Sequence, residues 1–181
     1  GEKSSLASST SRNLGRTIGG TNLIQRKVCG RKLDMVFKRN SEEYGLTECS
    51  RYHQSNDTKQ LMDGGFKMPK ILKDMFVNLV NSCPDKVRDI ETVGYQLMET
   101  KFILFIMDSP AGVVCRINHL YPLKFPDDPD LITKQLLQIL EVVYRSRLII
   151  ERTRLITLDR VVAFDLGEDG PIPPCFQRFI M

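Results

Sequence analysis

Two stretches near residue 40 alternate between apolar and polar side chains, which predicts a pair of strands. Within residues 31–39, the apolar side chains of Leu33, Met35 and Phe37 alternate with Asp34, Val36 and Lys38. A polar turn at 40–43 follows, and residues 44–49 form the second run. Because so few residues separate the two runs, a hairpin is the simplest connection between them.

A helical region is predicted over approximately residues 58–82. Gly64 and Gly65 are expected to interrupt it, and Pro69 suits the first turn of a fresh helix. Beyond Pro69, large apolar side chains recur at spacings of three and four and form one stripe: Ile71, Leu72, Met75, Phe76, Leu79 and Val80. Lys67, Lys70 and Lys73 are expected on or near the opposite side.

The second half of the chain predicts three further strands, over 93–100, 101–108 and 113–120. Residues 102–107 are apolar on both faces, which indicates a central strand that is covered on each side. Residues 127–130 (Asp-Asp-Pro-Asp) favour a helix start, and that helix is expected to run to about Arg154. A last strand is expected over 156–166. These elements predict an α/β fold with a mixed, largely antiparallel sheet of about five strands, flanked by helices.

The expected domain organisation is a flexible arm at 1–20 and a single domain at 21–181. Residues 1–20 contain almost no large apolar side chains with which to offset the entropy of ordering. The composition as a whole, 41% hydrophobic and 27% charged, is typical of a globular protein. No apolar run approaches the roughly 20 residues that span a bilayer, so no membrane association is expected.

Cysteine usage and charge narrow the function classes. The five cysteines form no CxxC pair and are accompanied by two histidines, which argues against a zinc site and favours reduced thiols in the nucleus or cytoplasm. Residues 1–90 carry 16 Lys/Arg against 10 Asp/Glu, whereas residues 91–181 carry 10 against 12. The basic half would attract an anionic partner such as DNA or RNA. A solvated basic face is the simpler alternative.

The two predicted hairpin strands each carry one acidic residue among apolar neighbours, Asp34 and Glu48. Carboxylates on neighbouring strands can hold a divalent metal, and a buried carboxylate is costly unless a metal or a base neutralises it. In the simpler alternative, Asp34 pairs with Arg31 or Lys32, and Glu48 pairs with Arg51 or Lys38. Such surface ion pairs contribute little to stability.

The strand carrying Asp34, the strand carrying Glu48 and the helix after them resemble the PD-(D/E)XK nuclease superfamily, mainly over residues 28–80. More narrowly, GRKLDMVF, YGLTEC and KMPKILKDMF are similar to a group of fungal proteins of unclear role. The resemblance implies a restriction-endonuclease-like fold with Asp34 and Glu48 as Mg²⁺ ligands. It also implies that the backbone carbonyl of Cys49 completes the inner shell.

The family motif places a lysine two residues after the glutamate, where this chain has Ser50. A hydroxyl cannot replace an ammonium group in stabilising the transition state. A lysine from the following helical region, Lys59, Lys67 or Lys73, could reach back to supply the charge. Nucleic-acid contacts are expected from the basic side chains of Arg31, Lys32, Lys59, Lys67 and Lys70.

The sequence therefore predicts a nucleic-acid-associated protein with a nuclease-like core, either cleaving phosphodiesters with Mg²⁺ or catalytically degenerate. The alternative is a non-catalytic scaffold or effector that uses the same fold to bind a protein partner.

Overall fold

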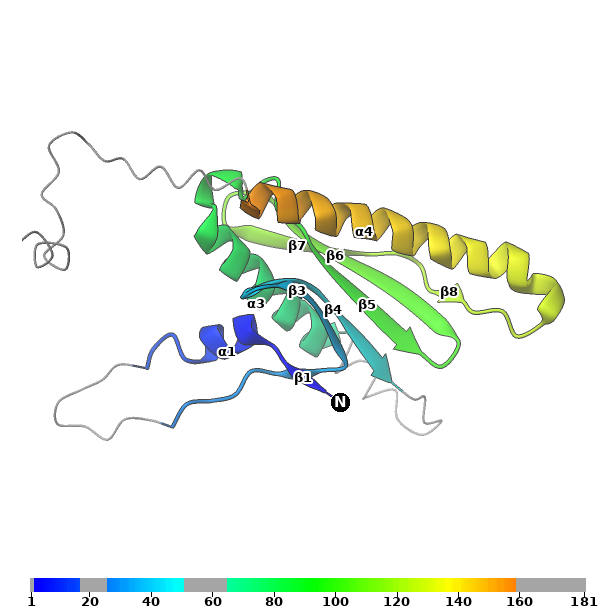
Figure 1. Cartoon of the computed structure of the whole chain (residues 1–181), viewed down its shortest axis with the longest axis horizontal. Coiled ribbons are helices and arrows are strands. Elements are labelled where there is room, and N and C mark those ends of the chain that lie inside the picture. Colours follow the sequence, from blue (N-terminus) through cyan, green and yellow to red (C-terminus); the bar gives the residue numbers. More distant parts are fainter. Residues whose placement is uncertain (1, 17–25, 51–64, 159–181) are drawn as a thin grey trace, which may run out of the picture.

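A computed structural model of the chain describes residues 2–16, 26–50 and 65–158, and a mixed β-sheet forms its centre (Figure 1). The strand order is β3-β4-β5-β6-β7, and β8 also pairs with β6. The strands are β3 (Met35–Arg39), β4 (Glu42–Ser50), β5 (Thr92–Met98), β6 (Lys101–Ala111), β7 (Val114–His119) and β8 (Leu123–Lys124). β4 and β5 run parallel, and the other pairs in this sheet are antiparallel. The predicted mixed, largely antiparallel α/β sheet is confirmed.

The predicted hairpin is formed by β3 and β4. Its register pairs Met35 with Thr47 and Phe37 with Gly45. Asn40 lies in the turn with a φ of 54°, a left-handed conformation that asparagine tolerates better than most residues. The single strand expected over 31–39 is divided, because Asp34 forms a bend between β2 (Lys32–Leu33) and β3.

Helix α3 (Met68–Ser82) covers one face of the sheet. Pro69 lies in its first turn, as predicted. The predicted apolar stripe packs on the sheet, and its fully buried members include Ile71, Leu72, Met75 and Leu79. The approach is close at Gly94 of β5, where an added Cβ would lie 3.1 Å from both the Leu72 and Met68 side chains.

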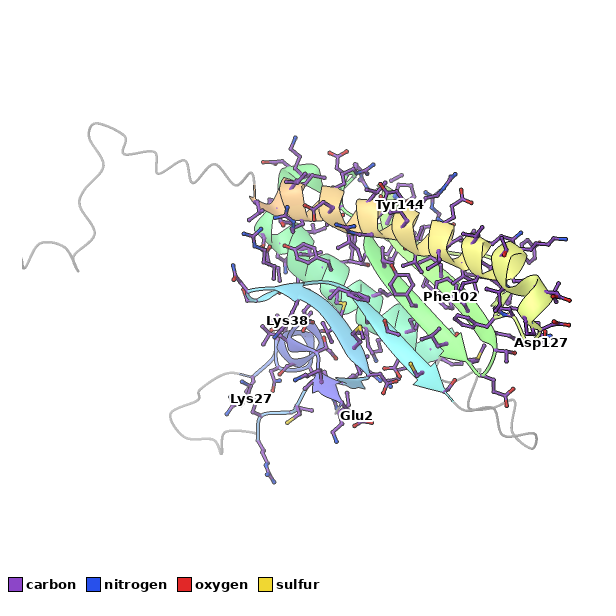
Figure 2. The ribbon with its side chains drawn as sticks, turned by 45° about the vertical axis from the view of Figure 1, so that its right-hand side comes forward. Glu2, Lys27, Lys38, Phe102, Asp127 and Tyr144 are labelled. Atoms are coloured by element: carbon purple, nitrogen blue, oxygen red, sulfur yellow. The ribbon has the colours of Figure 1, made fainter. Side chains whose placement is uncertain are left out.

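Helix α4 (Leu137–Leu158) covers the other face (Figure 1). Ile139 packs there against a cluster that includes Val93, Tyr95, Phe102 and Leu104, and Figure 2 shows Phe102 between the sheet and this helix. The apolar run at 102–107 is thus covered on both faces, as predicted.

The start of the α4 region is more irregular than expected. Asp128 caps it, its carboxylate accepting the amide of Asp130, but a 3₁₀ turn (Pro129–Leu131) and a π-helical turn (Ile132–Leu136) precede α4. The expected strand over 156–166 is wrong for 156–158, which continue α4. Thr157 is buried on the same side of the helix as Thr153, so the helical spacing persists to the end of α4. Residues 159–166 lie outside the described part of the chain.

The expectation of a flexible arm is wrong for residues 6–12. Helix α1 (Leu6–Arg12) packs beside α3, and β1 (Lys3–Ser4) pairs with β2. The Ser5 side chain caps α1, and Ala7 is buried. Tertiary contacts supply what the polar composition of this segment lacks. Residues 17–20 and 58–64 lie outside the described ranges. Within those ranges, no helix combines the length and apolar character needed to cross a membrane.

Candidate nucleic-acid interface and carboxylate site

Asp34 occupies the bend before β3, one residue outside the paired register, which ends with Met35 opposite Thr47; extended by one residue, that register would bring Asp34 opposite Glu48. Residues directly opposite each other in an antiparallel pair project to the same face. The Asp34 carboxylate accepts the backbone N–H of Cys49, with Oδ2 2.6 Å from the nitrogen. Asp34 is exposed. The expectation of a costly buried carboxylate at this position is therefore wrong, because the Asp34 side chain at the bend is exposed and is satisfied by a backbone amide.

Glu48 is the buried member of the two, with 7% of its surface exposed. Its Oε2 lies 2.8 Å from Nζ of Lys67, in the turn that leads into α3. The side chain of Lys67 is 28% exposed. A partly buried pair of this type is screened less by salt than a surface pair. The sequence predicts the same need for a neutralising partner at Asp34 and at Glu48, and of these two Glu48 is the one that is buried and paired with a lysine.

Lys67 is one of the lysines expected to compensate for Ser50. Ser50 ends β4, and Lys67 reaches the carboxylate from the start of the next described element. Lys73 lies further along α3 and contributes to a groove described below, and Lys59 is outside the described residues. The alternative partners for Glu48 were Lys38, which the structure does not place with it, and Arg51, which lies outside the described residues.

The thiol of Cys49 lies close enough to the Asp34 and Glu48 carboxylates to be affected by both of their charges. Partial burial raises the pKa of its thiol, and the negative charges of Asp34 and Glu48 raise it further. The thiol is therefore held protonated at neutral pH, which disfavours it as a metal ligand. The backbone carbonyl of Cys49 belongs to the segment that pairs with β5, opposite Leu97.

The donor chemistry of Asp34, Glu48 and the Cys49 carbonyl fits Mg²⁺, which prefers oxygen ligands and retains several waters. The ammonium group of Lys67 already lies on the Glu48 carboxylate. A cation would share or displace that contact. Among the described residues, no cluster of three or more His, Cys, Asp or Glu side chains is placed to hold a metal.

A groove of about 1240 Å³ runs between α1, α3 and the β6–β7 edge of the sheet. Its basic lining residues are Arg31, Lys67, Lys70 and Lys73, and Asp74 is the acidic one. Lys32, also expected to contact nucleic acid, is instead highly exposed, and its Nζ lies 3.4 Å from Glu2. Four basic residues named by the sequence analysis therefore line one groove: Lys70 and Lys73 on α3, Lys67 just before it, and Arg31 across from it.

Two residues that sequence reasoning missed lie close to this site. Phe66 lines the groove beside Lys67 and is 62% exposed. Gln96 pairs with Glu48 in the β4–β5 register and is 2% exposed, and its Nε2 makes no hydrogen bond to the described residues. A glutamine between Tyr95 and Leu97 in an apolar strand was the available signal.

Sequence patterning also misses Glu43, because it belongs to the polar run at 40–43, which predicts a turn. It is 2% exposed and holds the start of α1: Oε2 accepts the Ser5 hydroxyl at 2.7 Å, and Oε1 accepts the amide of Leu6 at 2.7 Å. A third bond comes from the amide of Ala7. This carboxylate fixes the α1 wall of the groove.

In comparisons with known proteins, no protein-family model, no curated protein and no solved structure matches the chain.

Proposed function

We propose that this protein binds nucleic acid along the groove between α1 and α3. The observation that carries the proposal is the concentration of four cationic side chains in the groove lining, those of Arg31, Lys67, Lys70 and Lys73, with Asp74 as the acidic one. Lys67 is paired with Glu48, so Arg31, Lys70 and Lys73 are the cations without a bond to that carboxylate. Lysine and arginine side chains that neutralise phosphates provide most of the affinity of non-specific nucleic-acid binding.

Phe66 is proposed to make the groove prefer unpaired bases over duplex nucleic acid. An exposed aromatic ring next to lysines is costly in water but provides a stacking surface for an unpaired base. Duplex bases are already stacked on one another. The groove is therefore proposed to favour single-stranded DNA or RNA.

A second candidate activity, metal-dependent phosphodiester cleavage, is favoured by the contact between Glu48 and Lys67. In this proposal the chain is a degenerate or active relative of the PD-(D/E)XK nucleases, with Asp34, Glu48 and the Cys49 carbonyl as the Mg²⁺ ligands. A bound Mg²⁺ would activate water and offset phosphate charge. Lys67 would supply, from the turn before α3, the positive charge that Ser50 lacks.

Binding is tested by fluorescence anisotropy with labelled single-stranded and duplex DNA and RNA, without divalent metal. The double variant Lys70→Ala/Lys73→Ala should weaken binding at least about tenfold near 0.1 M salt, because two phosphate contacts are lost. The matched control, Lys101→Ala/Lys134→Ala, removes the same charge outside the groove lining and should bind almost as wild type. Equal weakening by both doubles would reduce the effect to net charge and contradict the groove.

Cleavage is tested with Mg²⁺ or Mn²⁺ on the same substrates. Activity should be lost in Asp34→Asn and in Glu48→Gln and retained in Glu141→Gln, which lies on α4. Calorimetric titration with Mg²⁺ should give a binding isotherm for the wild type and none for the Asp34→Asn/Glu48→Gln double variant.

Lys67→Met separates the two roles of the lysine. Because the ammonium group competes with a cation for Glu48, this variant should bind Mg²⁺ more tightly while cleaving more slowly. Nucleic-acid binding without cleavage would leave the binding proposal in place and reject the nuclease. If neither were seen, the non-catalytic protein-interaction scaffold would become the better account.

A further inference from the structure

Helix α4 exposes a second apolar stripe on the side that faces away from the sheet. Its inner side is buried at Ile139, Ser146, Thr153 and Thr157. The outer stripe consists of six side chains that are each 45–58% exposed: Leu137, Leu140, Tyr144, Leu148, Leu155 and Leu158. Figure 2 shows Tyr144 on this outer side.

The spacing of the outer stripe is that of a helix-pairing seam. The steps along it are three, four, four, seven and three residues, and Glu151 divides the step of seven into three and four. This average of 3.5 residues is the repeat by which one helix packs along another. A surface helix needs one apolar stripe to cover its sheet, and a second one marks an interaction surface.

We propose that the outer stripe of α4 pairs with the same stripe of a second copy of this chain, antiparallel, about a two-fold axis between Arg147 and Leu148. Four of the six stripe residues are paired by this axis, and Leu148 lies beside the axis itself. Leu137 would face Leu158 of the second copy, and Leu140 would face Leu155. This proposal is independent of the groove and of the function assigned to it.

The same register accounts for the acidic interruption of the stripe. Glu151 would face Tyr144 of the second copy, whose phenol can donate to the carboxylate. Within the chain, Glu151 already accepts hydrogen bonds from Arg154, which together with neighbouring arginines lowers the pKa of its carboxyl group. Glu151 is therefore a charged acceptor, and its place opposite a tyrosine avoids an unpaired charge in the seam.

The charge along this part of the chain favours the antiparallel orientation. Residues 127–136 contain three Asp and one Lys, and residues 137–158 contain two Glu and four Arg. In this antiparallel register Glu141 of one copy would face Arg154 of the other, whereas a parallel, in-register pair juxtaposes like charges. Figure 2 shows Asp127 at the far end of the helix from its C-terminal turns.

The size of the seam predicts a concentration-dependent dimer. A helix of 22 residues is about 33 Å long, and one helix pair of that length buries less than the roughly 800 Å² per partner of a standard stable interface. Sedimentation equilibrium of the full chain should show a mass approaching twice 20.7 kDa as the concentration rises to about 100 µM. A monomer throughout this range would overturn the proposal.

The seam is located by Leu155→Glu, which places a charge opposite Leu140 at both symmetric positions and should yield a monomer. The control Tyr121→Glu introduces the same charge at a 90% exposed site outside α4 and should dimerise as wild type. Circular dichroism checks that both variants fold. A folded Leu155→Glu protein that still dimerises would overturn the proposed seam.

Oxidative cross-linking tests the register without a disruptive charge. Leu148→Cys should form an intermolecular disulfide above the wild-type background, because the two copies of residue 148 flank the axis. Leu137→Cys should not, since its two copies would lie about 32 Å apart along the pair. Cross-linking of Leu137→Cys with none for Leu148→Cys would exclude the antiparallel arrangement. If 159–181 or another protein occupied the face instead, neither variant would cross-link, and the dimer would again be excluded.

Discussion

Three polar side chains on β4, those of Glu43, Tyr44 and Glu48, are nearly inaccessible to solvent and are each matched to specific partners. Glu43 holds the start of α1, Tyr44 lies between Glu42 and Thr157, and Glu48 contacts Lys67. A buried polar group without a partner costs about 1–3 kcal/mol, so these contacts fix where the surrounding segments can dock. Side chains of β4 therefore make polar contacts with α1, with α4 and with the turn before α3.

Tyr44 provides a pH-dependent test of this packing. The pKa of its phenol is raised from 10.0 to about 12, chiefly by burial and secondly by the hydrogen bond to Glu42. Since the folded state favours the neutral phenol, this stabilisation is complete below pH 10 and is lost as the pH rises toward 12.

Tyr44→Phe should lower the free energy of unfolding at pH 7 by about 1–2 kcal/mol, because two hydrogen bonds are lost. It should also lose less stability than the wild type between about pH 10 and pH 12 in urea unfolding. Tyr121→Phe, at a 90% exposed position outside α4, serves as the control. Parallel alkaline curves for wild type and Tyr44→Phe would contradict this assignment.

The groove depends on two elements held in different ways. α3 packs through its own apolar stripe, whereas α1 has seven residues and is too short to be stable alone. Its position depends on the Ser5 cap and on Glu43. One wall of the groove is therefore anchored by a hydrophobic layer, and the other by the Glu43 carboxylate together with hydrogen bonds that link α1 and Asn13 to residues 28–31.

Glu43→Ala should release α1 while leaving the sheet intact. The amides of Leu6 and Ala7 lose their acceptor, so their hydrogen exchange should accelerate at least about tenfold, and the free energy of unfolding should fall by about 1–3 kcal/mol. Glu2→Gln, at an exposed site in the same segment, should leave both unchanged. Unchanged exchange in the Glu43 variant would show that other contacts hold α1.

Phe66, immediately before Lys67, distinguishes base stacking from simple charge attraction. Phe66→Ala should weaken binding to single-stranded DNA or RNA by about 1–3 kcal/mol, roughly 5- to 150-fold, and leave duplex binding and the salt dependence nearly unchanged. Val77→Ala removes an exposed apolar side chain from the same groove and is the matched control. Equal losses for single strands and duplexes would argue against stacking.

The molecule is a layered structure in which one sheet serves two cores. α1 and α3 lie on one face and α4 on the other (Figure 1). Alternate residues of β5 and β6 belong to opposite layers: Phe105 packs on the α3 side, and Leu104 on the α4 side. The two layers are thus joined through the same strands and should unfold together.

Leu72→Ala and Leu104→Ala test this coupling. Each removes a buried side chain from a different layer and should cost about 2–5 kcal/mol. Because the sheet is shared, each variant should keep a single transition when tyrosine fluorescence and far-ultraviolet circular dichroism are compared during urea unfolding. Separate transitions in either variant would identify two independent units.

Elements with a regular pattern were predicted well from the sequence. The hairpin, the apolar stripe of α3 and the doubly covered strand β6 all follow from local spacing of side chains. The predictions of secondary structure are wrong where contacts between residues far apart in the sequence determine the local conformation. α1 forms because Glu43, more than thirty residues away, accepts its first amides, and Ile156–Leu158 stay helical because that side of α4 still packs on the protein.

The sequence by itself determined which residues could form the sheet and its covering helices, since the spacing of apolar side chains is a local property. It also identified Asp34 and Glu48 as carboxylates that require a partner if they are buried. Only the tertiary structure decided that the partner is Lys67, that Asp34 is exposed at a bend, and that four basic residues share one groove. These outcomes depend on strand register and on how α1 and α3 dock, which local spacing does not encode.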